Sequence, residues 1–187
     1  MPVADAAGDR GSRLVAIGGP AGSGKTTLAD ALARTLGVRH LDFDEVSLEV
    51  VNEGRARLPN LSEAQILARL RDERYRSLAH ATGALLRQGA PLLVVSAPFT
   101  AEAADPRAWN AWLDACGFRV VPMFVWLQLE PTARRARMVA RGSSRDTELL
   151  ASGRLLDMPP VPVIPALLVD ASWPLDQQVA AVMVATS

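Results

Sequence analysis

The sequence predicts an α/β fold built on a parallel β-sheet. Five short apolar runs are spaced along the 187-residue chain, and stretches with helical periodicity separate them. Most of these runs are continuously apolar rather than alternating, which is typical of strands that helices cover on both faces. We expect the strands at Leu14–Ile17, Val38–Phe43, Leu92–Val95, Val120–Leu127 and Leu167–Val169.

A helix of about three turns is predicted between the first two strands. Leu28, Leu32 and Leu36 recur at four-residue spacing and form one apolar face. Gly37 follows, and glycine readily adopts the left-handed conformation that ends many helices. This helix should therefore pack on the sheet and stop at Gly37.

Four more helices are indicated further along the chain. Ser62 followed by Gln65 matches a capping box, which predicts the start of a long helix that runs to about Gln88. Proline is favoured in the first turn of a helix. The other predicted helices cover Pro106–Ala115, Pro131–Arg141 and Pro174–Ala185.

The composition favours a single domain over residues 13–187. The chain is 49% hydrophobic, and residues 1–12 are small and polar, so we interpret them as a flexible tail. Twenty basic residues balance twenty acidic ones, which gives no reason to expect a nucleic acid or a membrane as partner. The single cysteine, Cys116, can form no internal disulfide. We expect a cytoplasmic monomer or homodimer.

A phosphate-binding loop is the clearest motif. Residues 19–26, GPAGSGKT, match G-x-x-x-x-G-K-[ST] between the first strand and the first helix. Such a loop points its N–H groups at phosphate oxygens, and the helix dipole adds positive potential. Lys25 would bridge the β- and γ-phosphates of ATP, and the Thr26 hydroxyl would ligate Mg²⁺. The residues expected to bind ATP here are Gly19, Ala21, Gly22, Ser23, Gly24, Lys25, Thr26 and Thr27.

The basic residues strengthen this interpretation. Nineteen of the twenty are arginine, and Lys25 is the only lysine, which argues against a chance glycine-rich turn. A GTPase is excluded, because the Asn-Lys-x-Asp motif that recognises guanine needs a second lysine. Motor-type and oligomeric ATPases usually carry a carboxylate at the end of a central strand, where this chain has Ser96.

The remaining class, small-molecule and nucleoside monophosphate kinases, closes an arginine-rich lid over the phosphates. After the fourth strand, Arg137 and Arg141 lie four residues apart and share one helix face, and Arg145 follows. A triphosphate would relieve the repulsion between these cations. The alternative is a solvated basic helix; binding of phosphate by at least one of the three arginines is favoured.

The phosphate loop, the acidic pair after the second strand and the spacing R-x-x-x-R-x-x-x-R-D resemble the shikimate kinase, gluconate kinase and chloramphenicol phosphotransferase group. The resemblance implies a three-layer P-loop NTPase fold with five parallel strands in the order 2-3-1-4-5 and a mobile lid at about residues 141–152. It implies that Arg137 lies along the adenine and that Arg141 and Arg145 reach the phosphates during catalysis. Ser96 departs from the carboxylate of many relatives, which leaves open how the waters of magnesium are held.

Asp44 is the candidate residue on the acceptor side. It ends the second strand at the sheet edge where ligands bind in open α/β folds. In the resembled kinases an aspartate here faces the acceptor hydroxyl, so Asp44 would orient that hydroxyl and accept its proton. Asp44 could instead cap the helix that follows. Asp42 and Glu45 are weaker candidates.

Arg74 interrupts the apolar stripe that Leu67, Leu70 and Leu78 form on the long predicted helix. A cation on an apolar face must be paired or must reach a cleft. Binding of the substrate and an internal ion pair with a nearby aspartate are equally good interpretations. Pro98 follows the third strand at the same sheet edge and is expected to line the acceptor pocket.

These observations predict an enzyme that uses ATP and Mg²⁺ to transfer the γ-phosphate to a hydroxyl of a small polar molecule. Two alternatives stay open at this point. One is a nucleoside monophosphate kinase in which Arg74 holds the acceptor phosphate, and the other is a non-catalytic, regulatory nucleotide-binding ATPase.

Overall fold

The computed structural model describes residues 12–117, 120–142, 150–151 and 161–186. Within them, five parallel strands form one sheet in the order β2-β3-β1-β4-β5, which confirms the predicted topology. All five predicted strands are present, and none of their ends shifts by more than two residues. The strands are β1 (Ser12–Gly18), β2 (Arg39–Asp42), β3 (Leu92–Ser96), β4 (Val120–Gln128) and β5 (Leu167–Asp170).

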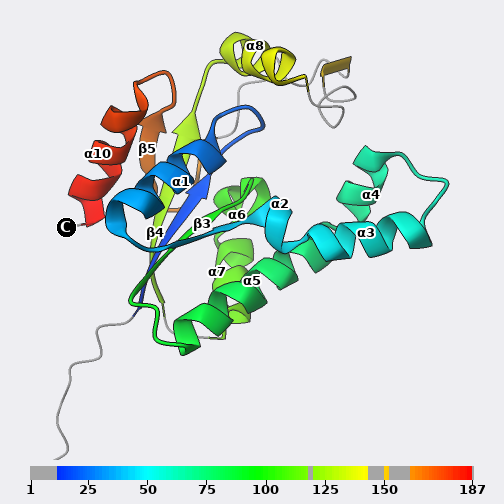
Figure 1. Cartoon of the computed structure of the whole chain (residues 1–187), viewed down its shortest axis with the longest axis horizontal. Helices are drawn as coiled ribbons and strands as arrows, with labels where there is room; N and C mark the ends of the chain where they lie inside the picture. Colours follow the sequence, from blue (N-terminus) through cyan, green and yellow to red (C-terminus); the bar gives the residue numbers. More distant parts are fainter. Residues whose placement is uncertain (1–11, 118–119, 143–149, 152–160, 187) are drawn as a thin grey trace, which may run out of the picture.

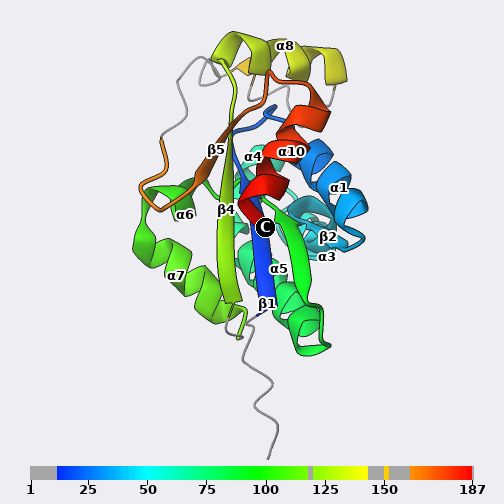
Figure 2. The same cartoon turned by 90° about the vertical axis from the view of Figure 1, so that its left-hand side faces the viewer.

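Helices cover both faces of the sheet, as Figures 1 and 2 show. On β1, Leu14 and Ala16 face a core shared with α5 and α7, whereas Val15 and Ile17 face a core shared with α1 and α10. This alternation explains why the strands are continuously apolar. The helices are α1 (Lys25–Leu36), α2 (Phe43–Val46), α3 (Leu48–Arg57), α4 (Glu63–Arg69), α5 (Arg71–Arg87), α6 (Thr100–Ala104), α7 (Pro106–Ala115), α8 (Pro131–Arg141) and α10 (Leu175–Thr186).

The predicted first helix is confirmed. Helix α1 buries Leu28 and Leu32 against the sheet and ends at Gly37, whose φ of 66° is left-handed. The N–H of Gly37 donates to carbonyl groups of the last turn. The apolar spacing and the glycine therefore fix the length of the helix that carries the phosphate loop.

The single long helix predicted from Ser62 to Gln88 is wrong in one respect. The capping box of Ser62 and Gln65 is present, but the helix breaks at Leu70 into α4 and α5. Leu70 is buried against Gly54 of α3, so the break lets α4 fold back and pack on α3. In Figure 1, α3 and α4 extend away from the sheet beyond the end of α5.

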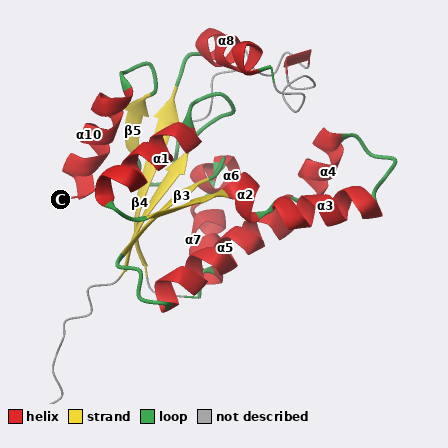
Figure 3. Cartoon of the chain, viewed as in Figure 1, coloured by secondary structure: helices red, strands yellow, loops and turns green. Residues whose placement is uncertain are grey.

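The parallel strands place the loops that follow them at one edge of the sheet, where α2 also begins (Figure 3). None of the helices in the described part of the chain is both long and apolar enough to cross a bilayer. The sheet edge is thus the natural place to look for a ligand site.

Candidate active site

The phosphate loop joins β1 to α1 and is shaped by its glycines. Gly19, Gly22 and Gly24 have φ values of 146°, 78° and 97°, which side chains rarely tolerate. A Cβ on Gly19 would also lie 2.9 Å from the carbonyl oxygen of Leu127. Gly24 caps α1 without a side-chain bond, and the first turn of α1 contains no acidic residue. The backbone is therefore arranged to receive an anion at the helix N-terminus.

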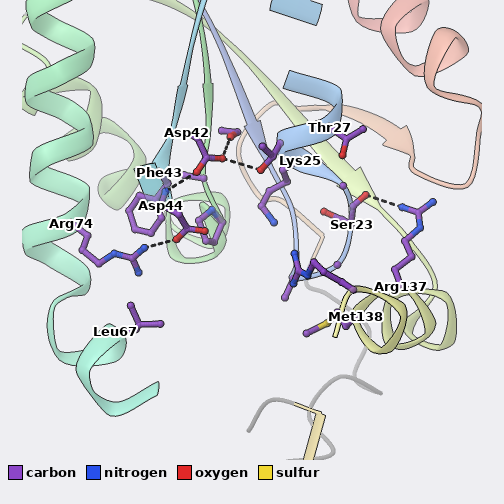
Figure 4. Close-up of a pocket in the computed structure, with 18 of the residues that line it drawn as sticks. Ser23, Lys25, Thr27, Asp42, Phe43, Asp44, Leu67, Arg74, Arg137 and Met138 are labelled. Atoms are coloured by element: carbon purple, nitrogen blue, oxygen red, sulfur yellow. Dashed lines mark hydrogen bonds and ion pairs between the residues drawn. The ribbon is translucent and has the colours of Figure 1, made fainter. Parts of the chain in front are cut away.

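Lys25 lies at the mouth of this loop. Its Nζ donates to the carbonyl oxygen of Pro20 at 2.9 Å, so the ammonium group reaches back across the loop to its second residue. Figure 4 shows Lys25 between Asp42 and Ser23. This position suits a cation that holds the outer phosphates of a bound triphosphate.

Asp42 lies beside the first turn of α1 and has a larger part in the site than the sequence indicated. The Thr26 hydroxyl and the Ser96 hydroxyl both donate to Oδ2 of Asp42 at 2.9 Å. Asp42 is the register partner of Ser96 in the pairing of β2 with β3. Ser96 carries no carboxylate, and Asp42 of the neighbouring strand places one beside it and beside the hydroxyl predicted to ligate magnesium.

Asp42 also caps α2, so the alternative role of Asp44 as an N-cap is wrong. Oδ1 of Asp42 accepts from the N–H groups of Asp44 and Glu45 at 2.8 and 3.4 Å. Asp44 stands in the first turn of α2, and it lines the cleft. The residue that caps the helix is the one at the end of the strand, because only that residue keeps an extended backbone.

Arg74 forms an internal ion pair with Asp44. Nη2 of Arg74 lies 2.6 Å from Oδ1 of Asp44, and the exposed fractions of the two side chains are 8% and 46%. Nε donates to the Ser47 hydroxyl, and the guanidinium lies over the ring of Phe43. Of the two interpretations of Arg74, the ion pair is the one present here. Both partners also line the cleft, so the pair forms part of its wall.

Arg137 lies on the other side of the phosphate loop, on α8. It donates to the carbonyl oxygens of Ser23 at 3.2 Å and Ala171 at 2.8 Å, which joins the phosphate loop to the segment after β5. Arg141, at the end of α8, is exposed and also lines the cleft. Arg145 and most of the predicted lid lie outside the described residues.

One cleft of about 930 Å³ brings these groups together. Its walls include the phosphate loop, Asp42, Asp44, Arg74 and Pro98, so these residues lie together at the sheet edge. Figure 4 shows Arg74, Asp44 and Leu67 on one side and Ser23, Arg137 and Met138 on the other. The cleft therefore has two sides, which we name after the ligands predicted for them: a nucleotide side at the phosphate loop and α8, and an acceptor side at Asp44, Arg74 and α4.

Several lining residues were not singled out from the sequence. On the acceptor side, α4 contributes Glu63, Ala64 and Leu67, and the helix break at Leu70 turns Leu67 from the expected core stripe toward the cleft. The remaining residues of this kind are Phe43, Met138, Leu175 and Gln178. The helical spacing of Ala64 and Leu67 is compatible with a shared face, but nothing in the sequence showed what that face meets.

The sheet order and the phosphate loop together define a P-loop protein with a kinase-type fold. The chain belongs to the AAA domain family AAA_33, whose model matches residues 14–158. No curated protein matches the chain. The family match begins within β1 and includes the phosphate loop, Asp44, Arg74 and α8.

Solved structures share this fold at low sequence identity. A gluconokinase from Sinorhizobium meliloti 1021 is 21% identical with a TM-score of 0.59, over 94% of this chain and 90% of that chain. An APS kinase from Mycobacterium tuberculosis, solved with AMPPNP and APS, is 22% identical with a TM-score of 0.59, over 92% and 96%. A shikimate kinase from Aquifex aeolicus is 14% identical with a TM-score of 0.53, over 92% and 95%.

Proposed function

We propose that this protein is an ATP-dependent phosphotransferase that moves the γ-phosphate of ATP to a hydroxyl group of a small polar molecule. The observation that carries the proposal is the placement of the Asp44–Arg74 pair and Lys25 on facing sides of one cleft. The similar gluconokinase, APS kinase and shikimate kinase support it, because each is named for phosphoryl transfer to a small molecule.

The residues present suit ATP and magnesium. The glycines of the loop adopt the positive φ values that a phosphate cradle requires, and Lys25 adds a cation beside the loop. The Thr26 hydroxyl and Asp42 offer the oxygen donors that Mg²⁺ prefers. Magnesium, when bound, would neutralise charge on the phosphate oxygens. Arg137 and Arg141 would hold the base and the phosphates on the nucleotide side.

Asp44 would orient the acceptor hydroxyl in line with the γ-phosphorus. The acceptor oxygen forms a bond to phosphorus while the bond to the leaving oxygen of ADP breaks, and Asp44 takes the hydroxyl proton. A carboxylate accepts several hydrogen bonds, so Asp44 can contact Arg74 and the hydroxyl together. Because phosphoryl transfer has a loose transition state, positioning by Asp44 and charge neutralisation by Lys25 contribute more than base strength.

The acceptor wall supports a hydroxyl acceptor over a nucleoside monophosphate. Among the described residues that line the acceptor side, Arg74 is the one arginine, and its guanidinium is already bound to Asp44. An acceptor phosphate would add a second anion to this single cation.

An ADP-release assay over a panel of sugars, sugar acids, cyclitols, hydroxylated antibiotics and nucleoside monophosphates tests the proposal. We expect one hydroxyl acceptor class to stimulate ADP release, and Lys25→Ala to abolish that release without loss of the fold. Lys25→Arg is the sharper variant, because it keeps the charge but replaces the compact ammonium; we expect at least a 100-fold loss in kcat. Tight ATP binding with no stimulation by any acceptor would favour a regulatory nucleotide-binding module instead.

A further inference from the structure

A closed ring of hydrogen bonds lies behind the magnesium edge of the cleft. Thr26 and Ser96 both donate to Asp42, as described above. His40 continues the ring, with Nε2 2.9 Å from the Ser96 hydroxyl and Nδ1 2.7 Å from Oδ1 of Asp30. Asp30 and Thr26 are four residues apart on α1, so one turn of that helix closes the ring.

The sheet register brings these side chains together. His40 and Asp42 are two residues apart on β2, so they point to the same face of the sheet. Ser96 is the partner of Asp42 on β3, which places its hydroxyl within reach of both. Helix α1 packs over the same region and supplies Asp30 and Thr26. The ring therefore ties two strands and the phosphate-loop helix to one another.

The ring is built in a way that fixes orientation. Asp30 is a carboxylate acceptor toward His40, so Nδ1 carries a hydrogen and the orientation of the imidazole ring is set. Only 10% of the His40 side chain is exposed, and Ser96 is buried. Buried polar groups whose hydrogen bonds are satisfied hold one arrangement strongly, because any other arrangement leaves them unpaired.

We infer that Asp30, His40 and Ser96 are positioning residues that hold the carboxylate of Asp42 at the magnesium edge of the nucleotide site. The inference rests on the proposed function, in which Thr26 and Asp42 serve the nucleotide-bound magnesium. Neither Asp30 nor His40 lines the cleft, so both act through Ser96 and Asp42. Removing His40 leaves Ser96 without the partner that orients its hydroxyl, and Asp42 gains freedom to turn.

The test is the gain in ATP affinity that Mg²⁺ produces, measured by calorimetry with and without Mg²⁺. For His40→Ala we expect this gain to fall by about 10-fold, which is the usual cost of losing a residue that orients a metal ligand. The affinity for ATP without Mg²⁺ should stay within about twofold of wild type. His40→Gln, which returns an amide near the Nε2 position, should recover part of the gain. His80 is exposed on α5, so His80→Ala is the matched control and should equal wild type.

A gain in His40→Ala equal to that of wild type would overturn the inference. If His40→Ala does not fold, Asp30→Ala replaces it, because the Asp30 side chain is 54% exposed and its loss spares the core. The affinity measurement needs no phosphotransfer. A protein that transfers no phosphate but shows the loss in His40→Ala would therefore refute the proposed function and support the positioning role.

A second readout is spectroscopic. In the ligand-free protein, the Nδ1 hydrogen of His40 should give a protected NMR resonance that His80 lacks and that Asp30→Ala abolishes. A His40 ring without a protected Nδ1 hydrogen would contradict the ring of hydrogen bonds directly.

Discussion

The two sides of the cleft differ in composition: backbone groups form one and side chains form the other. The nucleotide side is a contiguous backbone loop whose glycines adopt left-handed conformations, attached to β1 at the centre of the sheet. The acceptor side is assembled from side chains of short helices and from ion pairs such as Asp44 with Arg74 and Glu63 with Arg55. Figure 1 shows that α4, which carries part of this wall, and α3, against which α4 packs, stand away from the sheet.

This difference implies different responses to change. A backbone cradle offers the same N–H groups whatever the neighbouring side chains are, so it specifies phosphate and little else. Ion pairs with exposed partners contribute only about 0–1 kcal/mol each, so the acceptor wall can rearrange at small cost. We therefore expect the nucleotide side to be rigid and intolerant of substitution, and the acceptor side to carry specificity.

The largest expected effect comes from Gly19→Ala. The added Cβ would meet the backbone oxygen of Leu127, which cannot move aside as a side chain could. The φ of 146° at Gly19 is also one that residues with a side chain rarely adopt. We expect calorimetry to show at least a 100-fold loss of ATP affinity. Gly37→Ala is the matched control, because its φ of 66° is also left-handed but no atom lies within 4 Å of the added Cβ. It should lower stability by about 1–2 kcal/mol and leave ATP affinity intact.

If Gly19→Ala binds ATP as wild type does, the loop is not a rigid cradle and the contrast between the two sides fails.

The next effect is that of Asp44→Asn on the acceptor side. The neutral amide can neither position the hydroxyl as a carboxylate does nor take its proton, so kcat should fall by about 100-fold or more while the Kd for ATP stays within about twofold. The ion pair with Arg74 is also lost, which should reduce the unfolding free energy by about 1 kcal/mol, since Asp44 is half-exposed. Steady-state kinetics and thermal unfolding measure the two effects.

Glu45→Gln is the control for Asp44→Asn, because Glu45 is the exposed neighbour on α2. Nearly unchanged turnover is expected for it. Equal losses in both variants would show that Asp44 acts through general charge rather than through contact with the acceptor.

The smallest effect is expected from Gly54→Ala. An added Cβ would overlap the side chain of Leu70 at the helix break, which is buried but can shift. Because α4 would be displaced, the KM for the acceptor should rise by a few-fold and stability should fall by about 1 kcal/mol, with ATP affinity unchanged. The double variant Gly54→Ala with Leu70→Ala should restore the acceptor KM. A change in ATP affinity would mean that the two sides are coupled.

Much of the fold was predictable because its signals are local. Continuous apolar runs gave the strands, and the leucine spacing with Gly37 gave both the existence and the end of α1. The capping box at Ser62 was also correct. The break at Leu70 was not predicted, because the helical stripe continues through it and its cause is contact with Gly54 of another helix.

The candidate site was predictable to different degrees on its two sides. Lys25 and Thr26 were found from the motif alone, and the structure places both in the cleft. Asp42 was ranked below Asp44, although it is the residue that contacts Thr26 and Ser96. The missing information was the register of β2 on β3, which sets Asp42 opposite Ser96 and which a single sequence does not contain.

By itself, the sequence determined the phosphate loop, since eight contiguous residues carry all the backbone geometry that such a cradle needs. Only the tertiary structure decided which groups complete it. Asp42 and Ser96 are 54 positions apart, and Arg74 and Asp44 are 30 positions apart. Sheet register and helix packing bring such groups within hydrogen-bond distance, and these depend on the balance of many distant contacts rather than on any local pattern.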